Sequence, residues 1–198
     1  VSAWRSGDVV WTGSEFGLVW VEKISPINTC HLARIRSDST IIEDFVLPSC
    51  SETSLAWSND RYALVSSIEG EENNIKIEVY DPAISDYRLA RILTDTIEYS
   101  GYYTLTVVNN NLAIAWLDGR DSGCIDYDED DFCTVDVYMA IVSSNGTLLS
   151  SDTRISISDT KKSRISMVYT GNYIVLSWVE TTMEQKRIEI VSIDPCVE

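Results

Sequence analysis

Apolar and polar residues alternate along this chain in short runs, and one twelve-residue pattern occurs near both ends. Residues 11–22 read WTGSEFGLVWVE and residues 169–180 read YTGNYIVLSWVE, with Thr, Gly, Leu, Trp, Val and Glu in the same places. Weaker copies lie at 57–68 and 107–118. One motif used four times, at intervals of 46, 50 and 62 residues, predicts a repeat architecture.

The runs between turn residues have the two-residue period of β-strands, and none has the 3.6-residue period of a helix. β-branched and aromatic residues fill these runs, and Gly, Asn, Asp and Pro separate them. The expected strands are 8–12, 16–22, 30–36 and 41–47; 53–57, 62–68, 75–80 and 87–93; 102–108, 112–118, 135–142 and 153–158; and 164–170, 173–180 and 187–193. We expect almost no helix.

Four antiparallel strands per unit, repeated at this period, are typical of β-propeller blades. We therefore expect an all-β fold, a small propeller that forms a single domain over 1–198. Its four blade-like antiparallel sheets are expected at about 8–47, 53–93, 102–158 and 164–193. The second strand of each unit is the most apolar, as expected for a strand buried on both faces between neighbouring blades. The last blade lacks its outer strand, so it is either three-stranded or completed by another segment or chain.

The composition limits the classes of partner. The 198 residues carry a formal net charge of −16, which argues against binding to nucleic acid or to anionic membrane surfaces. No apolar run approaches the roughly 20 residues of a membrane span, so no membrane insertion is expected. The sequence has no initiator Met and no basic-then-apolar leader, which favours a processed or excised product.

The third unit resembles a known repeat. It carries Ala115-Trp116-Leu117-Asp118-Gly119-Arg120, then Asp136-Val137-Tyr138, Asn145-Gly146-Thr147 and Arg154-Ile155-Ser156. This series is similar to the W-x-D-x-R … D-x-Y … G … R-I-S repeat of secreted bacterial β-propeller proteins, relatives of the sialidase-type propellers. The resemblance implies the propeller fold. It does not imply glycosidase activity, because the chain has no Asp box and has Ser156 where the sialidase R-I-P element has Pro.

Five cysteines favour an oxidising compartment, and hence a secreted, extracellular or cell-surface location. Cys124 and Cys133 lie close together in a polar loop, so we expect a disulfide between them. Cys30 and Cys50 flank hairpin neighbours and form the second expected pair. Cys196 is left over, which suggests an intermolecular bond or a free thiol.

The most distinctive insert, 118–133, holds seven carboxylates in 16 residues. Ca²⁺ takes six to eight oxygen ligands, which closely spaced carboxylates can supply. The candidate metal ligands are Asp118, Asp121, Asp126, Asp128, Asp130 and Asp131. An EF-hand is excluded because Asp131 and Val137 occupy its Gly and final Glu positions. A Ca²⁺ site and a solvated acidic loop both remain open as interpretations of this insert.

Three carboxylates, Glu22, Asp118 and Glu180, share one column at the ends of second strands. Paired carboxylates at the mouth of a propeller could hydrolyse glycosides. The favoured interpretation is that they cap strand ends and bond neighbouring turns. The single His31 is interpreted as a hydrogen-bonded strand histidine, and Asn145 belongs to a glycosylation sequon at a turn.

Six tryptophans could stack on sugars, but most occupy repeat positions. An interblade core position is the better interpretation for all except Trp4, because an indole ring supplies a large apolar area. The tryptophans expected in the core are Trp11, Trp20, Trp57, Trp116 and Trp178.

No catalytic set is assembled by the sequence, and no catalytic residue is assigned. Together with the repeat, the cysteines and the acidity, this favours a non-enzymatic secreted or cell-surface propeller that serves as a binding, adhesion or scaffold module. Its partner is expected to be a protein or carbohydrate surface. One alternative is a carbohydrate-active, glycosidase-like enzyme. A second is a structural subunit of an extracellular filament, which self-assembles by strand donation at the edge 187–193.

Overall fold

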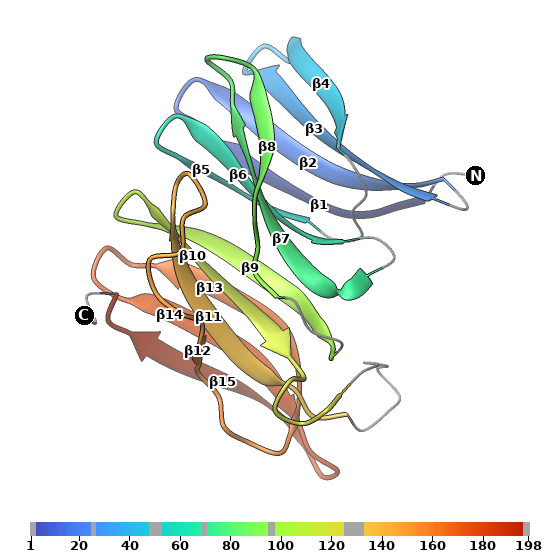
Figure 1. Ribbon diagram of the computed structural model, residues 1–198, viewed down its shortest axis with the longest axis vertical. Helices are drawn as coiled ribbons and strands as arrows, with labels where there is room; N and C mark the ends of the chain where they lie inside the picture. Colours follow the sequence, from blue (N-terminus) through green and yellow to red (C-terminus); the bar gives the residue numbers. More distant parts are fainter. Residues whose placement is uncertain are drawn as a thin grey trace.

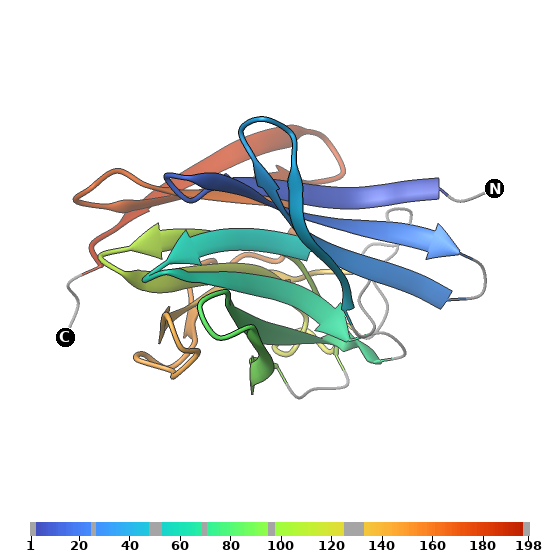
Figure 2. The same ribbon diagram turned by 90° about the horizontal axis from the view of Figure 1, so that it is seen from above.

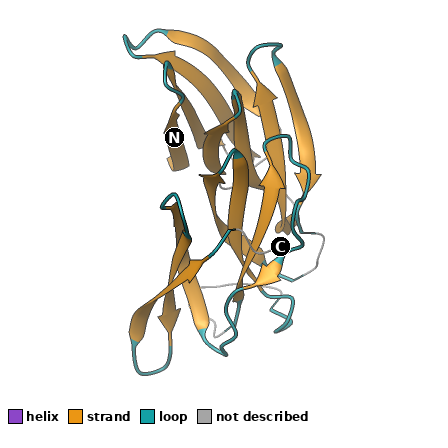
Figure 3. Ribbon diagram, turned by 90° about the vertical axis from the view of Figure 1, so that its left-hand side faces the viewer, coloured by secondary structure: helices purple, strands orange, loops and turns teal. Residues whose placement is uncertain are grey.

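The computed structural model confirms an all-β fold, built from four antiparallel sheets (Figure 1). The structure describes residues 3–24, 27–47, 53–68, 71–94, 98–124 and 133–195. All elements in these ranges are strands, turns or irregular segments, and none is a helix (Figure 3). A strand lies at each expected place, although the one expected at 153–158 is shorter.

Each sheet is a meander in chain order. The first comprises β1 (Ala3–Trp11), β2 (Glu15–Ile24), β3 (Ile27–Arg36) and β4 (Ile41–Leu47). The second comprises β5 (Thr53–Ser58), β6 (Arg61–Ile68), β7 (Glu71–Asp81) and β8 (Asp86–Ile92). The third comprises β9 (Ser100–Val108), β10 (Asn111–Asp118), β11 (Asp136–Ser143) and β12 (Thr153–Arg154). The fourth comprises β13 (Lys161–Tyr169), β14 (Ile174–Thr181) and β15 (Lys186–Ile193).

The hairpin between the first two strands of each sheet has the backbone that its turn residues favour. Residues 59–60 and 109–110 are Asn-Asp and Asn-Asn pairs in which both φ angles are positive. Two-residue turns of this kind match the right-handed twist of the flanking strands. Gly13 and Gly171 provide the positive φ in the first and last sheets.

The four sheets lie side by side in a row, as successive propeller blades do (Figures 1 and 2). The first strand of each sheet lies against the first strand of the next, in the order β1, β5, β9, β13. We number the sheets as blades 1 to 4 along this row.

The core consists of apolar layers between neighbouring blades. Blades 1 and 2 meet through Val19, Val21, Leu55 and Leu64; blades 2 and 3 through Val65, Ile77, Ile114 and Trp116; blades 3 and 4 through Ala115, Leu117, Leu176 and Trp178. The second strands β6 and β10 are consequently buried on both faces. In β14, at the end of the row, buried and half-buried residues alternate.

Polar bonds cross the first and the last of these layers, at opposite ends of the sheets. In the first, the Tyr62 hydroxyl of blade 2 donates to Glu15 of blade 1 over 2.9 Å, and Arg34 donates to the same carboxylate. In the last, Lys162 of blade 4 donates to Asp136 of blade 3 over 3.2 Å. These bonds fix the lateral position of one blade on the next.

Two expectations need correction. The strand expected at 153–158 extends only over β12, because the Ile155 N–H bonds Val137 O while the Ser156 hydroxyl accepts the Val137 N–H. A side chain thereby replaces part of the backbone ladder. Trp11 and Trp20 are not interblade core residues: 48% of the Trp11 surface is exposed and Trp20 is half-buried, since no described blade covers that face of blade 1.

Candidate functional site

Charged residues of the third unit that the structure describes form one continuous polar cluster at the end of blade 3. It starts at Trp116, whose indole N–H donates to Asp118 Oδ2 over 2.9 Å. Both side chains are buried. The Arg120 guanidinium donates to the same Oδ2 over 2.6 Å, and the Arg120 backbone N–H donates to Oδ1 over 2.9 Å. The Asp118 carboxylate is thus held by donors on several sides.

The cluster continues across the sheet from Arg120. Its guanidinium lies 4.4 Å from the centre of the Tyr138 ring, and the Tyr138 hydroxyl donates to Asp121. Arg154 pairs with Asp121 at 3.1 Å and also with Asp136. Burial, together with the bond to Asp121, raises the pKa of Tyr138, so the phenol stays protonated.

A buried lysine completes the cluster from the neighbouring blade. The Lys162 ammonium donates to Val135 O and Ser158 O, each over 2.8 Å, and to Asp136 Oδ1 over 3.2 Å. Lys162 is fully buried. We call Asp118, Arg120, Asp121, Asp136, Tyr138, Arg154 and Lys162 the blade-3 network. Acidic and basic groups alternate through it and compensate one another.

The same design recurs at Glu180 in blade 4. Its carboxylate accepts from the Trp178 indole N–H at 3.2 Å, the Ser158 hydroxyl at 2.9 Å and Arg187 at 2.8 Å. Burial tends to raise the pKa of Glu180, but the bonds from Arg187, Trp178 and Ser158 outweigh it and lower that pKa. The Trp-x-acid repeat is therefore a hydrogen-bonded pair within one strand.

The third member of the column, Glu22, has a different neighbour. His31 stacks on Trp20 with ring centroids 4.7 Å apart, and its Nε2 lies 3.6 Å from Glu22. Its Nδ1 lies 3.6 Å from Asp44. Neither ring nitrogen makes a hydrogen bond with a described residue, so the interpretation of His31 as a hydrogen-bonded strand histidine was wrong. Stacking on the indole replaces the expected bond.

Two of the candidate metal ligands are described, and both have protein partners. Asp118 pairs with Arg120, and Asp121 pairs with Arg154 and Tyr138. Asp126, Asp128, Asp130 and Asp131 lie outside the described residues. Within the described ranges, no group of three His, Cys, Asp or Glu side chains is placed to hold a metal ion.

The structure joins Cys124 to Cys133 by a disulfide, with the Cα atoms 5.8 Å apart. Cys30 is also disulfide-bonded. Its expected partner Cys50 and the leftover Cys196 lie outside the described residues. The Asn145 side chain lies exposed in its turn, where its Oδ1 accepts from the Thr147 hydroxyl over 2.9 Å.

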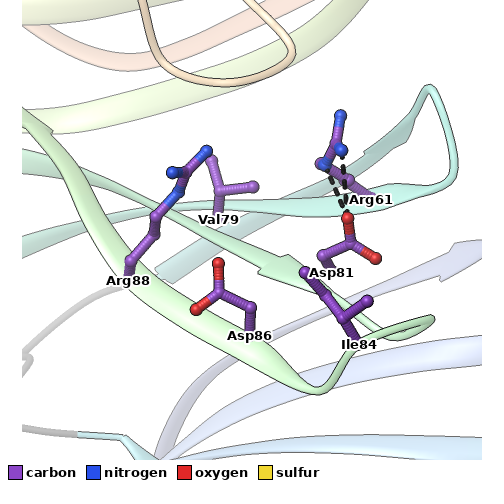
Figure 4. Close-up of a pocket in the computed structure, with 6 residues that line it drawn as sticks. All are labelled: Arg61, Val79, Asp81, Ile84, Asp86 and Arg88. Atoms are coloured by element: carbon purple, nitrogen blue, oxygen red, sulfur yellow. Dashed lines mark hydrogen bonds and ion pairs between the residues drawn. The ribbon is translucent and has the colours of Figure 1, made fainter.

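A small pocket that the sequence did not suggest lies on the outer hairpin of blade 2 (Figure 4). Its volume is about 140 Å³, and its lining residues are Arg61, Val79, Asp81, Ile84, Asp86 and Arg88. Arg61 pairs with Asp81 at 3.0 Å. Asp86 and Arg88 come from one strand, two positions apart, so both side chains stand on the same face of β8. In the sequence, only this two-residue spacing indicated that Asp86 and Arg88 lie side by side.

No protein-family model matches this sequence, and none of the curated proteins matches it. Solved structures do match in fold. A subtype N10 neuraminidase-like protein of a little yellow-shouldered bat strain from Guatemala gives a TM-score of 0.62 at 12% identity, over 96% of this chain and 59% of that one. The GH43 endo-arabinanase from Bacillus licheniformis gives 0.51 at 9% identity, over 94% and 72%.

A third match is the acylaminoacyl peptidase of Pyrococcus horikoshii, with a TM-score of 0.57 at 9% identity over 97% of this chain and 33% of that one. The chain therefore spans about three fifths of the neuraminidase-like protein and a smaller part of the peptidase. At these identities the likeness shows the propeller fold alone. In the described ranges, no helix has the length and apolar character needed to cross a bilayer.

Proposed function

We propose that this chain is a non-enzymatic propeller module that acts outside the cell, where it binds a protein or carbohydrate surface as an adhesion or scaffold element. The observation that carries the proposal is the blade-3 network. The charged residues of this network bond to one another and hold the end of the blade together. The fold likeness to neuraminidase-like and GH43 proteins supports a propeller of this kind without supplying a reaction.

Glycoside hydrolysis makes demands that these carboxylates do not meet. The reaction needs a carboxylic acid whose pKa is raised, so that it can protonate the leaving oxygen, and a second free carboxylate nearby. The pKa of Glu180 is lowered, and Asp118 is buried beneath Arg120 and Trp116. Both carboxylates are better suited to holding strand ends than to exchanging protons with a substrate.

A turnover assay tests the proposal against the glycosidase alternative. Chromogenic arabinosides and sialosides should show no hydrolysis above the rate in buffer. Asp118→Asn should lower the melting temperature, because it removes a charge that Arg120 compensates. Turnover by the wild-type protein that Asp118→Asn abolishes without a change in melting temperature would establish the enzyme instead.

The blade-2 pocket is the candidate contact point for the surface partner. Asp86 and Arg88 line it and make no ion pair with any described residue. Immobilised polysaccharides and cell-surface extracts should retain the wild-type protein and release Arg88→Ser. Arg91→Ser, on the same strand but outside the pocket lining, is the matched control and should bind like the wild type.

We also propose a Ca²⁺ site in the acidic loop 118–133, supported by its carboxylate density and by the Cys124–Cys133 disulfide, which restricts the loop. A ligand that binds only the native state stabilises it by mass action, so millimolar Ca²⁺ should raise the melting temperature relative to EDTA. Asp128→Asn should reduce this shift, whereas Glu184→Gln, in the β14–β15 hairpin outside this loop, should leave it intact. Equal melting temperatures in Ca²⁺ and EDTA would exclude the site.

Strand addition at β15 is the second candidate function, as in a filament subunit. β15 pairs with β14 alone among the described strands, so its other edge has backbone groups available for pairing. The amide protons on that edge should become protected from exchange as the protein concentration rises. Protection that stays constant over the whole concentration range would rule out strand addition.

A further inference from the structure

The two end faces of the row of blades are apolar although no described blade covers them. On blade 1, Val9 and Trp11 are 59% and 48% exposed, and Phe16, Leu18 and Trp20 share their face. On blade 4, Ile188 and Ile190 are 70% and 68% exposed, and Val168, Val175 and Val179 share their face. We call these five-residue sets the blade-1 open face and the blade-4 open face. Exposed apolar patches of this kind mark interaction sites.

The repeat indicates what kind of surface covers the blade-1 open face. Trp20 and Leu18 occupy the positions of Trp116 and Ile114 in blade 3. There the two residues are fully buried against blade 2. Their counterparts in blade 4, Trp178 and Leu176, are buried against blade 3. A face of this type therefore packs against the preceding blade.

The opposite relation holds at the other end of the row. Val175 and Val179 of blade 4 occupy the positions of Ala113 and Leu117 in blade 3. Ala113 and Leu117 are fully buried because blade 4 covers them. The blade-4 open face therefore matches the face that receives a following blade. This chain displays one face of each type, so the blade-4 open face of one copy is complementary to the blade-1 open face of another.

Charges on the two open faces are also complementary. Glu22 and Asp44 stand on the blade-1 face, since they share the side of the sheet with Trp20 and Leu18. Lys186 stands exposed on the blade-4 face, beside Ile188, and makes no ion pair with a described residue. Glu22 and Lys186 lie at the same end of their sheets, because Lys186 pairs with Thr181, the residue after the Glu180 that matches Glu22.

We propose that two copies of this chain pack head to tail, with the blade-4 open face of one copy on the blade-1 open face of the next. The contact continues the blade-to-blade packing that the chain already uses three times. A contact between two different faces closes into a ring or propagates, according to the rotation between copies. This inference goes beyond the proposed binding function and does not depend on it. It also differs from strand addition at β15, since it uses side chains on the sheet faces rather than backbone groups at the edge.

Sedimentation equilibrium with two single-face variants tests the proposal. Val9→Glu places a carboxylate on the blade-1 face and Ile190→Glu places one on the blade-4 face. Both sites are more than half exposed, so the isolated fold tolerates the change. An unpaired charge buried in the contact is costly, so each variant alone should associate at least about tenfold more weakly than the wild type.

Mixing the two variants distinguishes head-to-tail packing from other arrangements. Each variant keeps one intact face, so an equimolar mixture should form a one-to-one pair and nothing larger. Ile84→Glu, on the blade-2 hairpin and 71% exposed, is the matched control and should associate like the wild type. If two blade-1 faces or two blade-4 faces packed together instead, the variant that keeps that face intact would still form a dimer on its own. This result would overturn the proposal. A monomeric wild-type protein would also overturn it.

Discussion

At the scale of single residues, the Trp-x-acid pair of blades 3 and 4 shows how one strand compensates its own buried carboxylate. Successive residues in a strand point to opposite faces, so residues two apart share a face. The indole N–H of Trp116 or Trp178 consequently reaches the carboxylate of Asp118 or Glu180 directly. A buried carboxylate must be paired or hydrogen-bonded, and the indole provides part of that compensation from within the same strand.

Trp116→Phe should therefore destabilise the protein beyond the loss of ring volume. The substitution leaves a cavity and removes one donor from buried Asp118, which together cost about 2–4 kcal/mol. Trp11→Phe is the control, since Trp11 is half exposed, and its cost should stay within about 0.5 kcal/mol. Urea unfolding of both variants measures the difference. Equal urea midpoints for Trp116→Phe and Trp11→Phe would show that the hydrogen bond from the Trp116 indole to Asp118 contributes nothing to stability.

The protonation of Glu180 should make stability fall in acid. Its pKa is lowered in the folded state from the ordinary value of 4.5, so the ionised group stabilises the fold at neutral pH. That contribution is lost as the pH falls from about 4.5 through the folded-state pKa. Glu180→Gln should flatten this part of the melting-temperature profile, whereas Glu184→Gln, in the exposed 182–185 hairpin, should leave its slope unchanged.

At the scale of elements, the joint between blades 1 and 2 depends on a close approach at Gly17. A Cβ added to Gly17 would lie 2.1 Å from Tyr62 Cε1. Tyr62 is buried, packs on Trp57 with ring centroids 4.5 Å apart, and is anchored through its hydroxyl to Glu15. The ring cannot move away without breaking that anchor. Glycine in β2 is therefore a requirement of the neighbouring blade and not of the local backbone.

Gly17→Ala should cost about 1–3 kcal/mol, as overpacking in a core does. Without the clash, alanine in a strand would be favoured over glycine by about 0.5–1 kcal/mol, so the sign of the change reports the contact. The control is the same substitution on a Tyr62→Leu background, where the ring is absent. Thermal unfolding should show a smaller cost there; identical costs in both backgrounds would disconnect Gly17 from Tyr62.

At the scale of the whole molecule, alternation along the sequence predicted the strands well because it records which face of each strand is buried. The alternation could not show that Trp11 is exposed, since the burial of Trp11 depends on whether another sheet covers the blade-1 open face. Most residues of the blade-3 network could be identified in the sequence as members of the third repeat unit. Its pairings, such as Arg154 with Asp121, cross between strands and loops far apart in the chain. The blade-2 pocket has no sequence motif and required the fold.

Burial of Lys162 has a consequence for chemical labelling. Its ammonium lies between blades 3 and 4 with Val135 O, Ser158 O and Asp136 around it, so an acylating reagent cannot reach it in the closed protein. The amine reacts only when blade 4 moves away from blade 3. Lys186 is exposed and reacts at once. The acetylation rate of Lys162 relative to Lys186, followed by peptide mass spectrometry, therefore measures how often the last blade opens while the others stay folded.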